Sequence, residues 1–114
     1  MGADLFEQRL ASFLDAAQAN ITAYYQQHFQ SLAALGRIPQ LAIERGQRYI
    51  RIVKKEPGLT GGSVYCFIDT KPETLGNIYK AASYKAPAKH ARGNIMADDN
   101  GAGGVGVWGA IYLR

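Results

Sequence analysis

The fold is decided by the stretch Gln47-Arg48-Tyr49-Ile50-Arg51-Ile52-Val53-Lys54-Lys55, where the side-chain periodicity changes from that of a helix to that of a strand. Ile50 and Ile52 fall on one side of an extended chain. The residues on the other side are Tyr49, Arg51, Val53 and Lys55. This alternation predicts a strand with one buried face.

Two further strands are predicted after it. The glycine-rich loop at 57–62 turns the chain back. Residues 63–69 then place apolar side chains on both faces of an extended chain, which is typical of a central strand. A longer hairpin loop over 69–77 leads to a third strand at 78–83. These segments predict a short antiparallel sheet.

The last third of the chain has weaker signals. Pro87 lacks an amide donor, so residues 84–91 are predicted to form a loop or one helical turn rather than a strand. A short strand is expected near 94–96 and a turn at 98–104. Residues 105–114 predict a final strand, with Gly106 and Gly109 marking a bulge or bend.

Before Pro39 the pattern is helical. Asp4 and Glu7 have the spacing of a capping box, and apolar residues then recur at steps of three and four, which predicts a helix over about 4–35. The weaker helix formers at 20–22 could split it, and Gly36 with Pro39 predicts its end. Its apolar stripe either packs on the sheet or docks on a neighbouring subunit. The stripe consists of Phe6, Leu10, Phe13, Ala17 and Ile21.

Together these elements predict a mainly β protein with an N-terminal α-helix. A bent antiparallel sheet that follows a helix is the layout of a small β-barrel of the Sm or SH3 type. The expected division is a helical arm at 1–38 and a barrel domain at 39–114.

Bulk composition excludes several classes. The chain has 114 residues, of which 47% are hydrophobic and 19% charged, so one globular domain is expected. No apolar run is long enough to span a membrane, and the N-terminus carries acids instead of the basic start of a signal peptide, so we expect a cytoplasmic protein. Cys66, the single cysteine, is expected to be a buried apolar residue. Cys66, His28 and His90 do not form the cluster that a zinc site needs, and no cofactor is predicted.

The sequence feature that points to a function is the basic stretch at 79–95. No acidic residue lies between Glu73 and Asp98, and the net charge of the whole chain is +4. Lysines and arginines interleaved with tyrosines can neutralise phosphates and stack on bases. The alternative is an ordinary solvated loop in a basic protein. Pairing His90 with Ser83 or Tyr84 would give a base beside a nucleophile, but a histidine between lysines is more often a polar loop residue, so we predict no enzyme.

Residues 80–95, together with Val64-Tyr65-Cys66-Phe67-Ile68-Asp69, resemble a family of small marine phage proteins, cyanophage proteins included. The resemblance covers residues 46–114. It implies an Sm/LSm-like barrel behind a helix, assembled as a homo-oligomeric ring, with a role in nucleic-acid binding. Arg92-Gly93-Asn94-Ile95 is similar to the second Sm signature. The first signature, with the Asp and Asn of a uridine pocket, has no counterpart after residues 76–80, so uridine specificity is not implied.

Two hypotheses follow from the sequence. One is a non-enzymatic, oligomeric protein that binds RNA or single-stranded DNA; the other is a structural or host-interaction protein of a phage, without a nucleic-acid role. Either would act in the cytoplasm, that of the host if a phage encodes it. The candidate contact residues for nucleic acid are Lys80, Tyr84, Lys85, Lys89, His90, Arg92 and Asn94.

Overall fold

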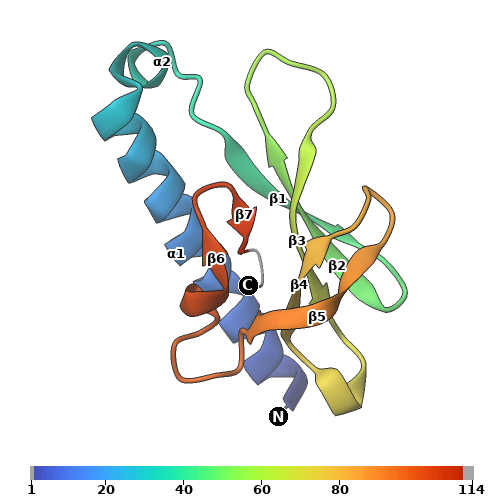
Figure 1. Ribbon diagram of the computed structural model, residues 1–114. Coiled ribbons are helices and arrows are strands. Elements are labelled where there is room, and N and C mark those ends of the chain that lie inside the picture. Colours follow the sequence, from blue (N-terminus) through green and yellow to red (C-terminus); the bar gives the residue numbers. More distant parts are fainter. Residues whose placement is uncertain (1, 112–114) are drawn as a thin grey trace.

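The computed structural model describes residues 2–111 and shows a long helix beside a strongly bent sheet (Figure 1). Two α-helices come first and strands follow. The helices are α1 (Gly2–His28) and α2 (Gln30–Ala34), with short 3₁₀ turns η1 (Pro72–Thr74) and η2 (Ala102–Gly104) later in the chain. The strands are β1 (Gln40–Arg45), β2 (Tyr49–Lys55), β3 (Ser63–Asp69), β4 (Asn77–Ala81), β5 (Pro87–Asn94), β6 (Val105–Gly106) and β7 (Gly109–Ala110).

The five longer strands form one antiparallel sheet in chain order, β1-β2-β3-β4-β5, and β6 pairs with β7 in a small hairpin. The prediction of a mainly β protein behind an N-terminal helix is confirmed. Among the described strands, β1 and β5 are the two edges and do not pair with each other, so the sheet is not closed into a barrel.

Helix α1 covers one face of this sheet, and the two share a single hydrophobic core (Figure 1). The predicted apolar stripe is buried throughout, with Ile21 fully buried. It packs with Ile50, Ile52, Cys66 and Ile68 from β2 and β3. Of the two expectations for the stripe, packing on its own sheet is what the structure shows.

The helix ends largely as predicted. It runs unbroken through 20–22 and is interrupted at Phe29, whose φ of −133° is not helical. Gly36 then adopts a left-handed φ of 71°, and the amides of Gly36 and Arg37 donate to the carbonyls of Ala33 and Leu32 at 3.1 and 2.9 Å. This is a Schellman motif, which satisfies the last carbonyls of α2.

Strand β2 departs from the prediction of one buried face. Between β2 and β3 the register shifts, so that Ile52 lies opposite Cys66 while Val53 lies opposite Val64, which leaves Tyr65 as the extra residue of a bulge. Val53 was expected on the open side, but it is 1% exposed. The close approach of Gly62 explains this, because a Cβ there would lie 2.9 Å from Val53 Cγ1.

Two other strand predictions were wrong. Strand β1 was not expected, and β5 occupies the part of the basic stretch that was predicted to be a loop. Pro87 fits there because it is the first residue of an edge strand, where a missing amide donor is tolerated. A single strand, bent at Gly106 and Gly109, was predicted over 105–114, but its described part reverses at 107–108 into the antiparallel β6–β7 hairpin; residues 112–114 lie outside the described part.

Within residues 2–111, no helix combines the length and the apolar character that crossing a bilayer would require.

Candidate nucleic-acid interface

The sheet face opposite α1 carries a row of side chains that crosses all five strands. We call it the outer face. Its members are paired directly across the strands, from Glu44 through Arg51, Phe67 and Tyr79 to Ala91. Directly opposed residues project to the same face of a sheet, so these side chains are neighbours.

Aromatic rings and an arginine fill the middle of the outer face. The ring of Tyr49 meets Phe67 and Tyr79 edge to face, with centroids 6.1 and 6.0 Å apart. Arg48 lies over the Tyr49 ring, with its Cζ atom 4.8 Å from the centroid. Phe67 and Tyr79 are almost completely buried, so Tyr49 and the arginines are the members of this cluster that reach solvent.

The turn between β4 and β5 folds back over this face and is held there through Tyr84. Arg51 Nε donates a 2.8 Å hydrogen bond to the Tyr84 carbonyl, and Arg51 Cζ lies 4.6 Å from the centroid of the tyrosine ring. The carboxylate of Glu44 accepts from both Arg51 Nη1, at 2.8 Å, and the Tyr84 hydroxyl, at 3.1 Å. The hydrogen bond from Arg51, helped by the one from Tyr84, lowers the pKa of Glu44, so the acceptor stays ionised at neutral pH.

A groove of about 320 Å³ lies beside Tyr84. Tyr84 and Leu59 are 46% and 66% exposed, so both present apolar surface to solvent. Val53, from β2, also lines it. The full lining is Glu44, Val53, Lys55, Leu59, Gly61, Gly62 and Tyr84. A flat aromatic ring could enter here and lie against the tyrosine.

The lysines of the basic stretch lie on this hairpin and its strand. Ser83 Oγ accepts hydrogen bonds from the amides of Lys85 and Ala86, both at 3.2 Å, which fixes the turn that carries Lys85. Further on, residues 88–90 of β5 lie opposite the single residue Lys80 of β4, so Lys89 sits in a bulge. Among the described side chains, which begin at residue 5 and end at 111, the exposed ammonium groups of Lys85 and Lys89 have neither an ion pair nor a hydrogen bond.

Two of the predicted contact residues are used by the protein itself. Asn94 Nδ2 donates to the carbonyl of Leu75 and to Asn77 Oδ1, both at 2.9 Å, and its Oδ1 accepts from the amide of Met96 at 2.7 Å. Both amide hydrogens are thereby occupied. Arg92 Nε donates to the Ile111 carbonyl at 3.0 Å, and Nη1 donates to the carbonyl of His90. Arg92 thus follows the alternative expected for an arginine, which is to bind carbonyls.

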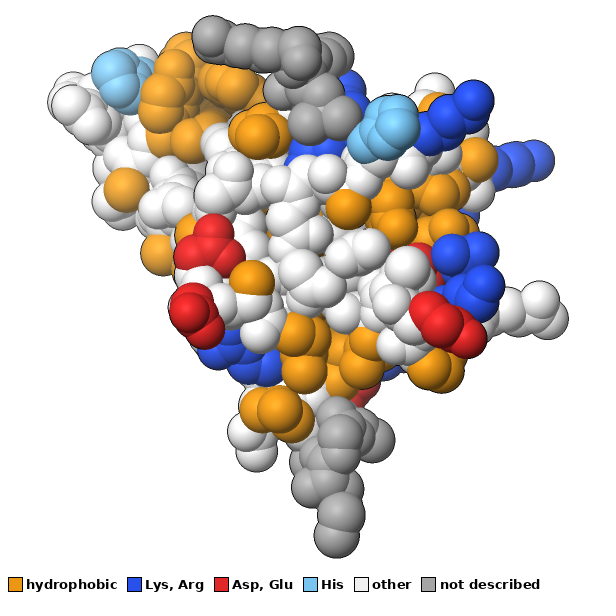
Figure 2. Space-filling view, turned by 60° about the horizontal axis from the view of Figure 1, so that its bottom comes forward, with side chains coloured by type: hydrophobic (Ala, Val, Ile, Leu, Met, Phe, Trp, Pro, Cys, Tyr) orange, Lys and Arg blue, Asp and Glu red, His pale blue; other side chains and the backbone are white. Residues whose placement is uncertain are grey.

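Lys80 and His90 complete the predicted set. Lys80 is half-buried in β4 and lines a groove with the β6–β7 hairpin, and His90 is exposed in the β5 bulge. In the face drawn in Figure 2, Lys and Arg side chains gather in separate groups, some of which have acidic side chains beside them while one lies beside a histidine. Charge alone therefore does not mark a binding surface on that face, and the position of each lysine matters.

Sequence reasoning identified Tyr84 but missed its two partners. Arg51 was placed on the open side of its strand, whereas Glu44 lies on the strand that was not expected. The alternation of Arg51 and Phe67 on neighbouring strands could have placed Arg51 on the outer face, but it does not connect Arg51 or Glu44 to Tyr84.

The described residues offer neither a reactive thiol nor a cluster of metal-ligating side chains. Cys66 is completely buried, and burial raises the pKa of its thiol, so the reactive thiolate is disfavoured. Among the side chains that the structure describes, those of residues 5–111, no three His, Cys, Asp or Glu are grouped so that they could hold a metal ion.

Comparison with known proteins gives a match at the level of a family. The model of a family of unknown function, DUF7717, matches residues 5–106, which include most of α1 and the whole five-stranded sheet. No curated protein matches the chain. No solved structure matches it either.

Proposed function

We propose that this chain, which belongs to the DUF7717 family of unknown function, binds single-stranded RNA or DNA and catalyses no reaction. The contact surface is the outer face together with the β4–β5 hairpin. The observation that carries the proposal is the fixed position of Tyr84, which Arg51 and Glu44 hold beside an open groove.

Stacking on Tyr84 supplies the first part of the interaction. A half-exposed ring that is already held in place loses little conformational freedom when a base packs on it. Arg51 covers part of the ring, and the groove leaves room beside it. Base stacking on an aromatic side chain contributes about 1–3 kcal/mol and tolerates any base, which suits a protein without a uridine pocket.

Electrostatic attraction supplies the second part. Lys85 and Lys89 are exposed on the same hairpin and its strand, and within the described residues no carboxylate neutralises them. Each phosphate that they contact releases condensed counterions, which gives affinity that weakens with salt. Lys80 and His90 support them. Because Asn94 has donated both of its amide hydrogens within the protein, and two nitrogens of Arg92 are bonded to carbonyls, these two residues contribute mainly to the shape of the surface.

The proposal includes assembly into a homo-oligomer, with a closed ring preferred. Strands β1 and β5 each have one neighbour in the described sheet, so each leaves one row of backbone groups without a strand partner. Pairing between copies would complete the ladders and place several identical hairpins around one assembly, which multiplies a weak contact. A phage origin belongs to the same proposal, as the sequence resemblance implies, and so does a cytoplasmic location; the Sm-like barrel that the resemblance also implies is not closed in this sheet.

The second candidate is a structural or host-interaction protein whose assembly is itself the function. It is favoured by the same unpaired edges and needs no ligand in the groove. The two candidates differ in whether nucleic acid binds at all.

The test is a binding titration with labelled single-stranded oligonucleotides, using the parent, Tyr84→Ala and Tyr84→Phe. The alanine variant is expected to bind about 5- to 150-fold more weakly, and the phenylalanine variant to retain most of the affinity because it keeps the ring. Equal binding by all three would overturn the role of Tyr84.

A further inference from the structure

We propose that a second pocket, on the other side of the β2–β3 loop, binds a phosphoryl group through the ammonium of Lys54. The pocket has a volume of about 200 Å³ and lies between the end of β2, the loop and the start of β3. Its lining is Lys54, Glu56, Leu59, Thr60, Gly61, Gly62 and Ser63. Nothing in the nucleic-acid proposal depends on this pocket.

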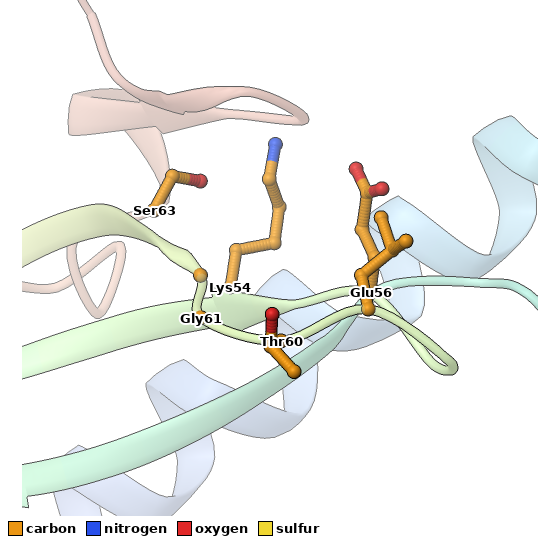
Figure 3. Close-up of a pocket in the computed structure, with 7 residues that line it drawn as sticks. Lys54, Glu56, Thr60, Gly61 and Ser63 are labelled. Carbon is orange, nitrogen blue, oxygen red and sulfur yellow. The ribbon is translucent and has the colours of Figure 1, made fainter.

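The polar groups of the pocket converge. In Figure 3 the ammonium of Lys54 and the hydroxyl of Ser63 project into the same space, and the Thr60 hydroxyl points to that side from the loop. A positive charge with hydroxyl donors around it is the donor set that a phosphate oxygen accepts from. The three side chains come from the end of β2, the loop at 56–62 and the start of β3, so one loop and its two flanking strands position all of them.

Lys54 is the principal group because its charge is half-buried and unmatched. Among the described side chains, those of residues 5–111, its ammonium makes neither an ion pair nor a hydrogen bond, and the Trp108 ring lies beside it, with the ring centroid 5.1 Å from Nζ. Burial lowers the pKa of Lys54, and the nearby Glu56 offsets part of that shift. An anion that accepts hydrogen bonds from this ammonium would compensate for the water that it has lost.

The two hydroxyls of the pocket can also donate hydrogen bonds to a ligand, because neither of them is already bonded within the described part of the protein. Thr60 and Ser63 side chains make no hydrogen bond to another described residue. Gly61 has a φ of +78°, and a Cβ added there would meet nothing within 4 Å, so the space beside this glycine is open. Gly62 has a packing role instead, because a Cβ there would lie 2.9 Å from the Lys54 carbonyl oxygen.

The negative charge of Glu56 repels an anion, so a variant that removes this charge should bind phosphate more tightly, whereas a variant that removes the Lys54 charge should bind it more weakly. Its carboxylate lines the pocket and is drawn near Lys54 in Figure 3, but no ion pair joins the two. If the role of Lys54 were only a long-range attraction to Glu56, removing the carboxylate would leave phosphate binding unchanged. If Lys54 binds phosphate, the same change removes a like charge and strengthens binding.

The pocket differs from the groove beside Tyr84, although both use the β2–β3 loop. Successive residues of a strand point to opposite faces, so Lys54 lies on the side of α1 and Trp108 while Lys55 lines the outer groove. The phosphoryl group could belong to free phosphate or to the terminal phosphate of a strand. The chemistry at Lys54 is the same for both.

The experiment uses Trp108, the only tryptophan of the chain, as a built-in reporter of the Lys54 ammonium. The full chain is titrated with potassium phosphate against potassium chloride of matched ionic strength, and calorimetry repeats the titration without relying on fluorescence. The variants are Lys54→Met, Glu56→Gln and, as the matched control, Lys71→Met, which removes an exposed lysine at η1. Lys54→Gln is the substitute if the methionine variant does not fold.

The parent and Lys71→Met are expected to saturate in the range of about 1–10 mM phosphate, Lys54→Met to bind about tenfold or more weakly, and Glu56→Gln to bind more tightly. A short oligonucleotide with and without a 5′-phosphate distinguishes the sources. If the parent binds the phosphorylated strand more tightly and Lys54→Met does not, the ligand of the pocket is a terminal phosphate. If inorganic phosphate saturates the pocket and the parent shows no such preference, the ligand is free phosphate. The proposal is overturned if neither ligand saturates, or if Lys54→Met binds as the parent does.

Discussion

Arg51 lies across the ring of Tyr84, with its Cζ atom 4.6 Å from the ring centroid and its Nε bonded to the Tyr84 carbonyl at 2.8 Å. The two residues are 33 positions apart in the sequence, and the contact fixes the tip of the β4–β5 hairpin on the outer face of the sheet. The position of the ring is therefore determined by β2 as much as by its own turn.

Replacing Arg51 by methionine is expected to weaken single-strand binding nearly as much as Tyr84→Ala does, because the ring then loses its support. The double variant should bind no more weakly than Tyr84→Ala, since Arg51 acts through the tyrosine. A double-mutant cycle measured by fluorescence polarisation checks this. Fully additive effects would show that Arg51 contacts the nucleic acid independently.

Changing Lys85 and Lys89 together to alanine is expected to flatten the salt dependence of binding. Each phosphate contact on a single strand contributes roughly 0.7 to the slope of log affinity against log salt, so the slope should fall by about one to two units, and by more in a ring. The matched control is Arg37→Ala with Lys71→Ala, which removes two exposed charges outside the hairpin. If the slope of log affinity against log salt falls equally in the control, the change reflects the net charge of the protein and not the positions of Lys85 and Lys89.

Asp69 is expected to be the carboxylate whose removal costs the most stability. It is fully buried and accepts hydrogen bonds from Arg48 at 3.1 and 3.0 Å, from the Lys71 amide at 3.0 Å and from the Thr74 hydroxyl at 2.6 Å. Asp69→Asn keeps the shape but loses the charge-assisted bonds, so the free energy of unfolding should fall by about 1–3 kcal/mol. Urea unfolding at neutral pH measures it.

The same carboxylate predicts a pH dependence. Burial raises the pKa of Asp69, but the hydrogen bonds from Arg48, Thr74 and Lys71 outweigh burial and leave the pKa below its usual value. The folded state therefore binds this proton more weakly than the unfolded state. Its contribution is present above the unfolded pKa of about 3.9 and is lost as pH falls through the lower, folded value. Unfolding curves of Asp69→Asn should lose less stability than the parent between pH 5 and the acid limit; parallel losses would contradict this.

Ile21→Ala is expected to lower the free energy of unfolding by about 2–5 kcal/mol, because this side chain is fully buried in the core that α1 shares with the sheet. Helix and sheet signals should disappear in one transition. Two separate transitions by far-ultraviolet and tyrosine probes would show that the arm at 1–38 is an independent unit.

The sequence predicted the elements whose periodicity reflects burial. The segment 63–69 was placed correctly because its side chains are apolar on both faces, and the stripe of α1 because a long buried helix repeats its pattern. Strand β1 escaped because, as an edge strand, none of its residues is buried. Strand β5 was not predicted, because a proline disfavours a strand unless that strand is known to lie at the edge of the sheet, and β5 begins with Pro87.

The candidate site shows the same division. Tyr84 and the lysines were visible as a local pattern, whereas Glu44 and Arg51 reach Tyr84 through strand pairing and a folded-back hairpin. Pairing between distant segments depends on the register of the whole sheet, and this sheet has register shifts in two of its strand pairs. Local patterns do not encode those shifts.

The most direct measurement is fluorescence polarisation of labelled single-stranded RNA and DNA titrated with the full chain at two ionic strengths, alongside its mass by light scattering. The account predicts binding of at least one of the two at low salt, a steep loss of affinity at the higher salt, and a mass above that of a monomer. No binding of either strand at low salt by a well-folded protein would contradict the central claim and favour the structural or host-interaction candidate.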